Sequence, residues 1–194
     1  CALLDNGDVR CWGENNNGQL GQDSQTDYGR TGTGTPASGP PKLMADLDAI
    51  DLGGHKAIAI SASRQHTCAL LENGDVRCWG EGDDGRLGQN SDDDYGKHPS
   101  TNPMSALDAI DLGGHKATAI SAGRWHTCAL LENGYVRCWG EGGWGQHGQD
   151  NRNDYGKSSS SWSMDDLDAI DVGFGGNHVL GNDDDKFDVF LAKY

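Results

Sequence analysis

One motif occurs three times in this chain, and this repetition constrains the fold more strongly than any other feature of the sequence. Each copy reads Cys-Ala-Leu-Leu-x-Asn-Gly-x-Val-Arg-Cys-Trp-Gly-Glu, and the copies begin at Cys1, Cys68 and Cys128. A long internal period is typical of repeat folds, in which each repeat buries its apolar face against its neighbours. We therefore expect one repeat domain over residues 1–194.

The spacing of the motif predicts approximate limits for the repeats. Repeat 1 is expected at about 1–59, repeat 2 at about 60–119 and repeat 3 at about 120–179, followed by a degenerate terminal segment at 180–194. Repeat 1 is the longest because it contains a Thr-, Gly- and Pro-rich insertion at 30–41. The terminal segment has no cysteine pair, but it includes a candidate strand at 187–191.

The composition favours an all-β protein and argues against several functional classes. Only 35% of the 194 residues are hydrophobic and 30 are glycine, so many turns are expected and long helices are not. No run approaches the ~20 apolar residues that span a bilayer, so membrane insertion is not expected. The net charge of −15 repels nucleic acid and anionic membranes and favours cations or basic partners.

Each motif predicts a β-hairpin that brings two cysteines together. Two β-prone runs flank Glu72-Asn73-Gly74, which suits a three-residue loop with the glycine in the left-handed conformation. Counting outward from this loop pairs Cys68 with Cys78 in the closely spaced class of an antiparallel ladder. The same count pairs Cys1 with Cys11 and Cys128 with Cys138, so all six cysteines are used. Three disulfides would place the protein in an oxidising compartment.

Zinc binding and free thiols are the alternatives to disulfides. His66 and His126 each lie two residues before a hairpin cysteine, so a His and a Cys share one strand face. Zinc motifs, however, usually place paired ligands two to four residues apart across a tight knuckle. The two histidines are otherwise expected to hydrogen-bond within or between repeats.

Three acidic loops suggest a second kind of metal site. Each ends in Asp-Tyr-Gly and carries carboxylates and amides at alternate positions, which are oxygen ligands suited to Ca²⁺. The candidate calcium ligands are Asp23, Asp27, Asn90, Asp92, Asp94, Asp150 and Asp154. The alternative is that these side chains bind nearby backbone amides and shape the loops.

The six tryptophans fall into two groups. Trp12, Trp79 and Trp139 occupy the same position in each repeat and are expected to pack between blades. Trp125, Trp144 and Trp162 interrupt the repeat, and single aromatic residues on a rim are candidate binding anchors. No Ser-His-Asp set or carboxylate pair recurs with a catalytic context, so the protein is not expected to be an enzyme.

These segments resemble regulator-of-chromosome-condensation repeats. The resemblance rests on Gly-x-x-His-Thr, the hairpin, Trp-Gly and then Gly-Gln-Leu-Gly, found at 120–149, at 60–89 and, truncated, at 1–22. The sequence departs from the pattern at Ser63, which replaces the glycine of Gly123, and at His147, which replaces a leucine. The resemblance implies a β-propeller of four-stranded antiparallel blades. Because the family usually has about seven repeats, roughly three blades would form part of a larger propeller or of an assembly.

The resemblance also implies a function in protein binding. Paired hairpin cysteines look most like those of bacterial secreted or surface members, so we expect an extracellular or cell-surface location. The leading hypothesis is an interaction module that binds another protein through its blade loops. The alternative is a structural subunit of an extracellular assembly or filament, in which copies join head-to-tail. We expect the tail at 169–194 to complete a blade with the Cys1–Cys11 hairpin of another copy, or with further repeats outside residues 1–194.

Overall fold

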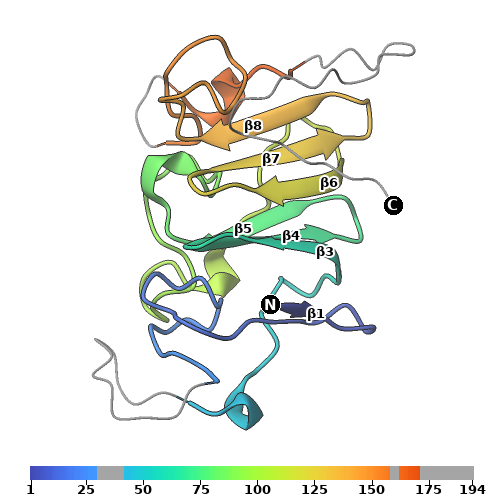
Figure 1. Cartoon of the computed structure of the whole chain (residues 1–194). Coiled ribbons are helices and arrows are strands. Elements are labelled where there is room, and N and C mark those ends of the chain that lie inside the picture. Colours follow the sequence, from blue (N-terminus) through green and yellow to red (C-terminus); the bar gives the residue numbers. More distant parts are fainter. Residues whose placement is uncertain (30–41, 158–161, 171–194) are drawn as a thin grey trace, which may run out of the picture.

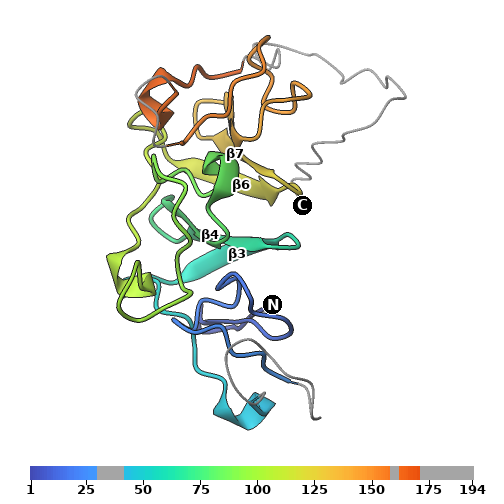
Figure 2. The ribbon, with the colours of Figure 1, turned by 90° about the vertical axis from the view of Figure 1, so that its left-hand side faces the viewer.

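The structure, a computed structural model, describes residues 1–29, 42–157 and 162–170, and it is an all-β repeat array. Three antiparallel sheets follow one another along the stack in sequence order, and the view turned by 90° shows the same succession (Figure 1, Figure 2). The insertion at 30–41 and the candidate strand at 187–191 lie outside the described residues. No helix of the described residues is long and apolar enough to cross a membrane.

Each sheet is built around one copy of the hairpin. The first contains β1 (Ala2–Leu3) and β2 (Val9–Arg10), and the second contains β3 (Ala57–Ala62), β4 (His66–Leu71) and β5 (Val76–Gly80). The third contains β6 (Ala117–Ala122), β7 (His126–Leu131) and β8 (Val136–Gly140). Four short 3-10 helices lie in the connections of the described residues: η1 (Met44–Asp46), η2 (Asp83–Gly85), η3 (Met104–Ala106) and η4 (Met164–Asp166).

The hairpin register follows the prediction made from the Asn-Gly turn. Leu70 pairs with Val76 and Cys68 with Cys78, and the amide of Leu71 donates to the carbonyl of Asp75 at 2.8 Å. Gly74 closes the loop at φ +81°, a conformation that favours glycine. The strands β3 and β6 begin at Ala57 and Ala117, shortly before the repeat starts expected at 60 and 120. The exact division into repeats stays a prediction.

The fourth strand implied by the resemblance is reduced to isolated bridges in the described residues. Tyr95 bridges Gly80 at the end of β5, and the amide of Ile110 donates to the carbonyl of Val76 at 2.9 Å. Around Ile110 the sequence Asp-Ala-Ile-Asp offers one large apolar side chain between two carboxylates. Ile110 and the flanking Leu107 and Leu112 are all buried, but the pairing with the sheet stays limited to these contacts and forms no strand in the described residues.

All six cysteines form disulfides, and each bond joins the two strands of one hairpin. The pairs are Cys1–Cys11, Cys68–Cys78 and Cys128–Cys138, each with 4.0 Å between the Cα atoms. No free cysteine is left in the described residues, which contain every cysteine of the sequence. The disulfide prediction is thus supported. No cysteine of the described residues is left as a free thiol or as a zinc ligand. Three disulfides are consistent with an oxidising compartment.

We expect the three disulfides to open in a defined order. Cys1 is exposed, whereas both cysteines of the other two pairs are buried. Since thiol–disulfide exchange requires access to sulfur, a mild reductant should open Cys1–Cys11 first. Partial reduction followed by alkylation and peptide mapping measures the order. If Cys68–Cys78 opened as fast as Cys1–Cys11, local unfolding rather than exposure would control the exchange.

The core lies between repeats rather than within them. Along β4, Ala69 and Leu71 belong to the apolar cluster shared with the first repeat, whereas Cys68 and Leu70 belong to the cluster shared with the third. Successive side chains of a strand point to opposite faces of the sheet. Both faces of the central sheet are therefore buried against neighbouring repeats, as the packing of propeller blades requires.

Candidate functional site

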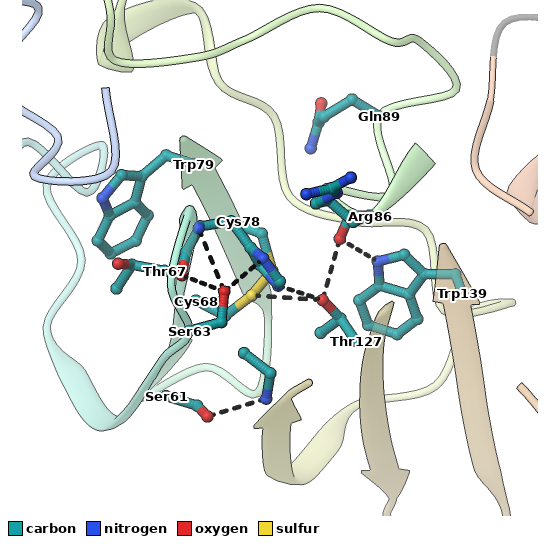
Figure 3. The surroundings of a disulfide bond; sticks show 12 residues. Ser61, Ser63, Thr67, Cys68, Cys78, Trp79, Arg86, Gln89, Thr127 and Trp139 are labelled. Atoms are coloured by element: carbon teal, nitrogen blue, oxygen red, sulfur yellow. Dashed lines mark hydrogen bonds between the residues drawn. A yellow bond between two sulfur atoms is a disulfide. The ribbon is translucent and has the colours of Figure 1, made fainter. Parts of the chain in front are cut away.

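Two backbone carbonyls form the centre of the junctions between repeats. The carbonyl of Gln19 accepts hydrogen bonds from Trp79 Nε1 at 3.1 Å and from Thr67 Oγ1 at 3.0 Å. In the next junction, the carbonyl of Arg86 accepts from Trp139 Nε1 at 3.1 Å and from Thr127 Oγ1 at 2.9 Å (Figure 3). The second and third repeats thus each hold the preceding repeat through one indole and one hydroxyl.

The repeated tryptophans do not share one environment. Trp79 and Trp139 are fully buried between repeats, as expected, but Trp12 is 45% exposed. The expectation that Trp12 packs between blades is therefore wrong for the described residues. Its motif is the same, but no preceding repeat in the described residues offers a carbonyl and an apolar surface to its indole. The burial of this tryptophan depends on the neighbouring repeat, not on the motif.

His66 connects the second repeat to the third. Its Nδ1 lies 2.7 Å from Ser63 Oγ, and its Nε2 lies 3.0 Å from Thr127 Oγ1. Because Thr127 donates its proton to the carbonyl of Arg86, His66 donates from Nε2 and accepts at Nδ1. The ring is fully buried, so this Ser–His pair cannot reach a substrate and has a structural role. The hydrogen-bonding role expected for His66 is confirmed.

Acid is expected to destabilise the fold through His66. Burial, reinforced by the charges of Arg86 and His126, lowers the pKa of His66 from 6.5 to about 3. Between those two pH values the unfolded chain binds a proton that the folded chain does not, so the stability present above pH 6.5 is lost as the pH falls toward 3. The free energy of unfolding of His66→Gln should therefore depend less steeply on pH than that of the wild type.

Urea titrations at several pH values measure this difference. Burial raises the pKa of the Glu81 and Asp92 carboxyls, which opposes the effect of His66 as acid is added. These carboxyls are present in both proteins, so the comparison of slopes isolates the histidine. Parallel curves for the two proteins would show that His66 is protonated in the folded state or solvated there.

Most candidate calcium ligands bind backbone amides instead. Within each loop one carboxylate Oδ1 accepts a backbone amide at 3.0 Å: Asp27 from Asn15, Asp94 from Gly82 and Asp154 from Gly142. Between repeats, Asp23 Oδ1 accepts the amide of Met104 and Asn90 Oδ1 accepts the amide of Met164, both at 2.7 Å. In the described part of the chain, no group of three or more His, Cys, Asp or Glu residues is placed to hold a metal ion. These contacts favour the loop-shaping interpretation, and calcium binding stays a prediction.

Replacing Asp94 by alanine separates the two interpretations. The change removes the acceptor of the Gly82 amide and the 2.7 Å ion pair with Lys97, so the free energy of unfolding should fall by about 1–2 kcal/mol. Asp93→Ala is the matched control, because this neighbouring carboxylate is exposed and should change stability by at most about 0.5 kcal/mol. Thermal melts in EDTA and in millimolar Ca²⁺ measure both effects. Stabilisation by Ca²⁺ that Asp94→Ala abolishes would support a calcium site.

The three candidate binding tryptophans lie apart. Trp144 is 78% exposed and lines a hollow of about 340 Å³ with Gly145 and Asp150. Trp162 packs edge-on against Tyr155 at 5.6 Å between ring centroids, and Trp125 is half-buried with the Arg124 guanidinium 4.2 Å from its ring. Only Trp144 therefore presents most of its surface to a partner.

Carboxylates gather on the loops that follow the hairpins. A hollow of about 320 Å³ is lined by Asp83, Asp92, Asp93 and Asp94, with Lys97 as its basic group. Next to it, Lys157 Nζ lies 3.7–4.0 Å from carboxylate oxygens of Asp84, Asp92 and Asp154. We call these loops, together with Trp144, the loop face. In Figure 1 the connections that follow β5 and β8 lie at the side opposite the hairpin turns.

Sequence reasoning missed one buried ion pair near the loop face. Arg86 donates to Glu81, and the two side chains are only 3% and 15% exposed. The same carboxylate accepts from Gln65 at 2.8 Å and from Asn17 of the first repeat at 3.2 Å. The sequence did carry a signal for this pair. Arg86 replaces the glutamine that the other two repeats have at this position, whereas Glu81, five residues earlier, is a glutamate in all three repeats.

Comparison with known proteins identifies the repeats. Two family models described as "Regulator of chromosome condensation (RCC1) repeat" match the chain, one at residues 6–70 and 73–130 and the other at 57–86 and 117–149. The chain is 40% identical over 101 residues to the ultraviolet-B receptor UVR8 of Arabidopsis thaliana, which covers 51% of this chain and 21% of the receptor. It is 28% identical over 171 residues to the E3 ubiquitin-protein ligase HERC2 of Mus musculus, which covers 88% of this chain and 3% of the ligase.

Solved structures show the same fold. Yeast RCC1 (Prp20), in a crystal structure with Kap60, has a TM-score of 0.58 at 20% identity, over 81% of this chain and 34% of that chain. Human WBSCR16 has a TM-score of 0.57 at 17% identity, over 87% of this chain and 36% of that chain. At these identities the likeness shows the fold alone. The chain spans about a third of the length of these two structures.

Proposed function

Since the chain belongs to the regulator of chromosome condensation (RCC1) repeat family, we propose that it is a secreted or cell-surface interaction module that binds another protein through its blade loops. The observation that carries this proposal is the loop face, where Trp144 is 78% exposed beside loops rich in carboxylates. An exposed aromatic side chain can anchor an interface, and surrounding charge steers a partner of the opposite sign. The partner is a protein with a basic surface.

The relatives support the class of partner but not its identity. Two structures of yeast Prp20 are described with protein partners: one is bound to Kap60, and the other is reported with its binding to Gsp1p and histones. For this chain, the three disulfides favour a partner met in an oxidising compartment. The net charge of −15 disfavours nucleic acid as the partner.

Binding of a basic protein tests the proposal. Core histones serve as the basic probe, and a short duplex DNA serves as the anionic comparison. Fluorescence anisotropy measures the dissociation constant of each. We expect histone binding that weakens with salt, at least ~10-fold weaker binding by the combined variant Trp144→Ala with Asp93→Asn, and no binding of DNA.

The control removes two charged groups at the hairpin turns, one more than the combined variant removes from the loop face. Asp5→Asn with Glu72→Gln removes two exposed carboxylates from the opposite side of the molecule. This control should bind histones as the wild type does. Equal losses for both combined variants would mean that net charge alone attracts the probe, and the loop face would then not be the binding site.

A second function, structural subunit of an extracellular assembly joined head-to-tail, is favoured by a separate observation. The first repeat exposes Trp12 and Met44, whereas the equivalent residues of the other repeats are buried in junctions. Surfaces built for a junction are thus displayed at the first repeat. Measurement of mass in solution distinguishes this function from the first.

A further inference from the structure

The outer side of the third repeat keeps the shape of a junction. At the two internal junctions, a Cβ added to Gly18 or to Gly85 would lie 2.6 Å from the Lys97 amide or 2.5 Å from the Tyr155 carbonyl oxygen of the following repeat. At Gly145, the equivalent position of the third repeat, a Cβ would meet no atom within 4 Å. In the described residues, the surface over Gly145 is therefore open.

The hollow beside Trp144 continues this open surface. Gly21 and Gly88 each face the indole Nε1 of the following repeat's tryptophan, at 2.9 Å from an added Cβ. Gly148, the equivalent glycine, faces only Ile170 among the described residues and lines the hollow of about 340 Å³. The hollow thus occupies the position at which a junction receives its tryptophan.

Asp150 keeps the backbone of a junction residue without the contact that explains it. Asp23 and Asn90 have φ of +48° and +52°, and each side chain accepts a methionine amide of the following repeat at 2.7 Å. Asp150 has φ +53°, but no hydrogen bond or ion pair of its carboxylate is found in the described part of the chain. Asp150 therefore keeps the loop conformation from which its two equivalents accept a methionine amide of the following repeat.

The first repeat displays the complementary groups. Trp12 is 45% exposed against 0% for Trp79 and Trp139, and Met44 is 47% exposed against 1% for its two equivalents. Both lie against Gly29, since a Cβ there would be 3.0 Å from Met44 Sδ and 3.5 Å from Trp12 Cδ1. Figure 1 places the first and third repeats at opposite ends of the stack.

We propose that the first repeat of a second copy of this chain docks on the third repeat. The Trp12 indole of the second copy fills the hollow between Trp144 and Gly148 and donates to the carbonyl of Gln146, and its Met44 amide donates to Asp150. Residues 171–194 of the same chain contain neither tryptophan nor methionine, so they cannot supply these two residues. The contact is heterologous, so copies add head-to-tail into a ring or a filament. This inference rests on the second proposed function.

Two single variants, one at each end, test the contact. Trp12→Ala removes the indole, and Gly145→Asn adds a side chain where the junctions leave no room, at φ +76°, which asparagine tolerates. Analytical ultracentrifugation from 1 to several hundred micromolar measures the mass of the intact chain. The wild type should associate, and each variant should raise the dissociation constant by ~30-fold or more, the effect of truncating a buried interface tryptophan.

Mixing the two variants gives the sharpest result. Trp12→Ala keeps an intact third repeat and Gly145→Asn keeps an intact first repeat, so the mixture should form dimers and no larger species. Gly114→Asn and Tyr135→Ala are the controls: Gly114 has φ +77° with no atom within 4 Å of an added Cβ, and Tyr135 is exposed on a hairpin. Both controls should associate as the wild type does.

A wild type that stays monomeric, variants that associate normally, or a mixture that forms no dimer would each overturn the inference. Binding of histones by a monomeric wild type would leave the interaction function standing while removing this contact. If association required Trp12 and Gly145 but the chain bound no histone, the contact between copies would stand and the interaction function would be removed.

Discussion

Trp139→Ala is expected to lower the free energy of unfolding by about 3–5 kcal/mol. The indole is fully buried between the second and third repeats, and its Nε1 donates to the carbonyl of Arg86 at 3.1 Å. Truncation leaves a cavity and removes one of the two donors on that carbonyl, although Thr127 still binds it. Equilibrium unfolding in guanidinium, followed by circular dichroism at low protein concentration, measures the loss.

The matched control is the same substitution at the equivalent position of the first repeat. Trp12 is 45% exposed, so Trp12→Ala should cost about 1 kcal/mol or less in the dilute monomer. Trp79, which is buried as Trp139 is, should show the large loss. A loss at Trp12 as large as that at Trp139 would mean that its indole is covered in the isolated chain.

Local features of this fold could be predicted from the sequence because they depend on few neighbouring residues. The loop Glu72-Asn73-Gly74 fixes the strand register through a turn that requires a positive φ, and the register alone brings Cys68 to Cys78. The equivalent hairpins follow the same rule. The three disulfides were thus predictable without knowledge of how the repeats pack.

Contacts between repeats were not predictable in the same way. Trp12 and Trp139 stand in identical motifs, yet only the neighbouring repeat decides whether the indole is buried. The oxygen-rich spacing around Asp23 suggested a metal site, but the atom that its Oδ1 binds is the Met104 amide, 81 residues away in the sequence. In the sequence, carboxylates that bind a metal ion and carboxylates that accept backbone amides have the same spacing. The fold is needed to show which amide lies near each carboxylate.

The three candidate binding tryptophans show the same limit for the prediction of function. Sequence alone marked Trp125, Trp144 and Trp162 equally, because each interrupts the repeat. Packing against Arg124 and Tyr155 removes part of the surface of two of them, and only Trp144 stays mostly exposed. Exposure is a property of the folded chain, so the choice among the three required the structure.

Glu81→Ala should have the second large effect on stability. The Glu81 carboxylate binds the guanidinium of Arg86, whose side chain is 3% exposed, and accepts hydrogen bonds from Gln65 and Asn17. Burial, together with the charges of Asp83 and Asp94, raises the pKa of Glu81, although Arg86 lowers it. Such a pair adds little net stability, but removal of one partner leaves the other charge buried.

We therefore expect Glu81→Ala to lower the free energy of unfolding by about 3 kcal/mol, with Asp84 left as the remaining carboxylate on Arg86 at 3.1 Å. The control is Glu141→Ala at the equivalent position of the third repeat, where the neutral Gln146 takes the place of the arginine and donates at 3.1 Å. Loss of that neutral contact should cost about 1 kcal/mol. The double variant Glu81→Ala with Arg86→Gln should recover much of the stability, because it removes the buried guanidinium that has lost its Glu81 partner and restores the glutamine of the other repeats. If the double variant were no more stable than Glu81→Ala, the loss would come from the contacts with Gln65 and Asn17 rather than from the buried guanidinium.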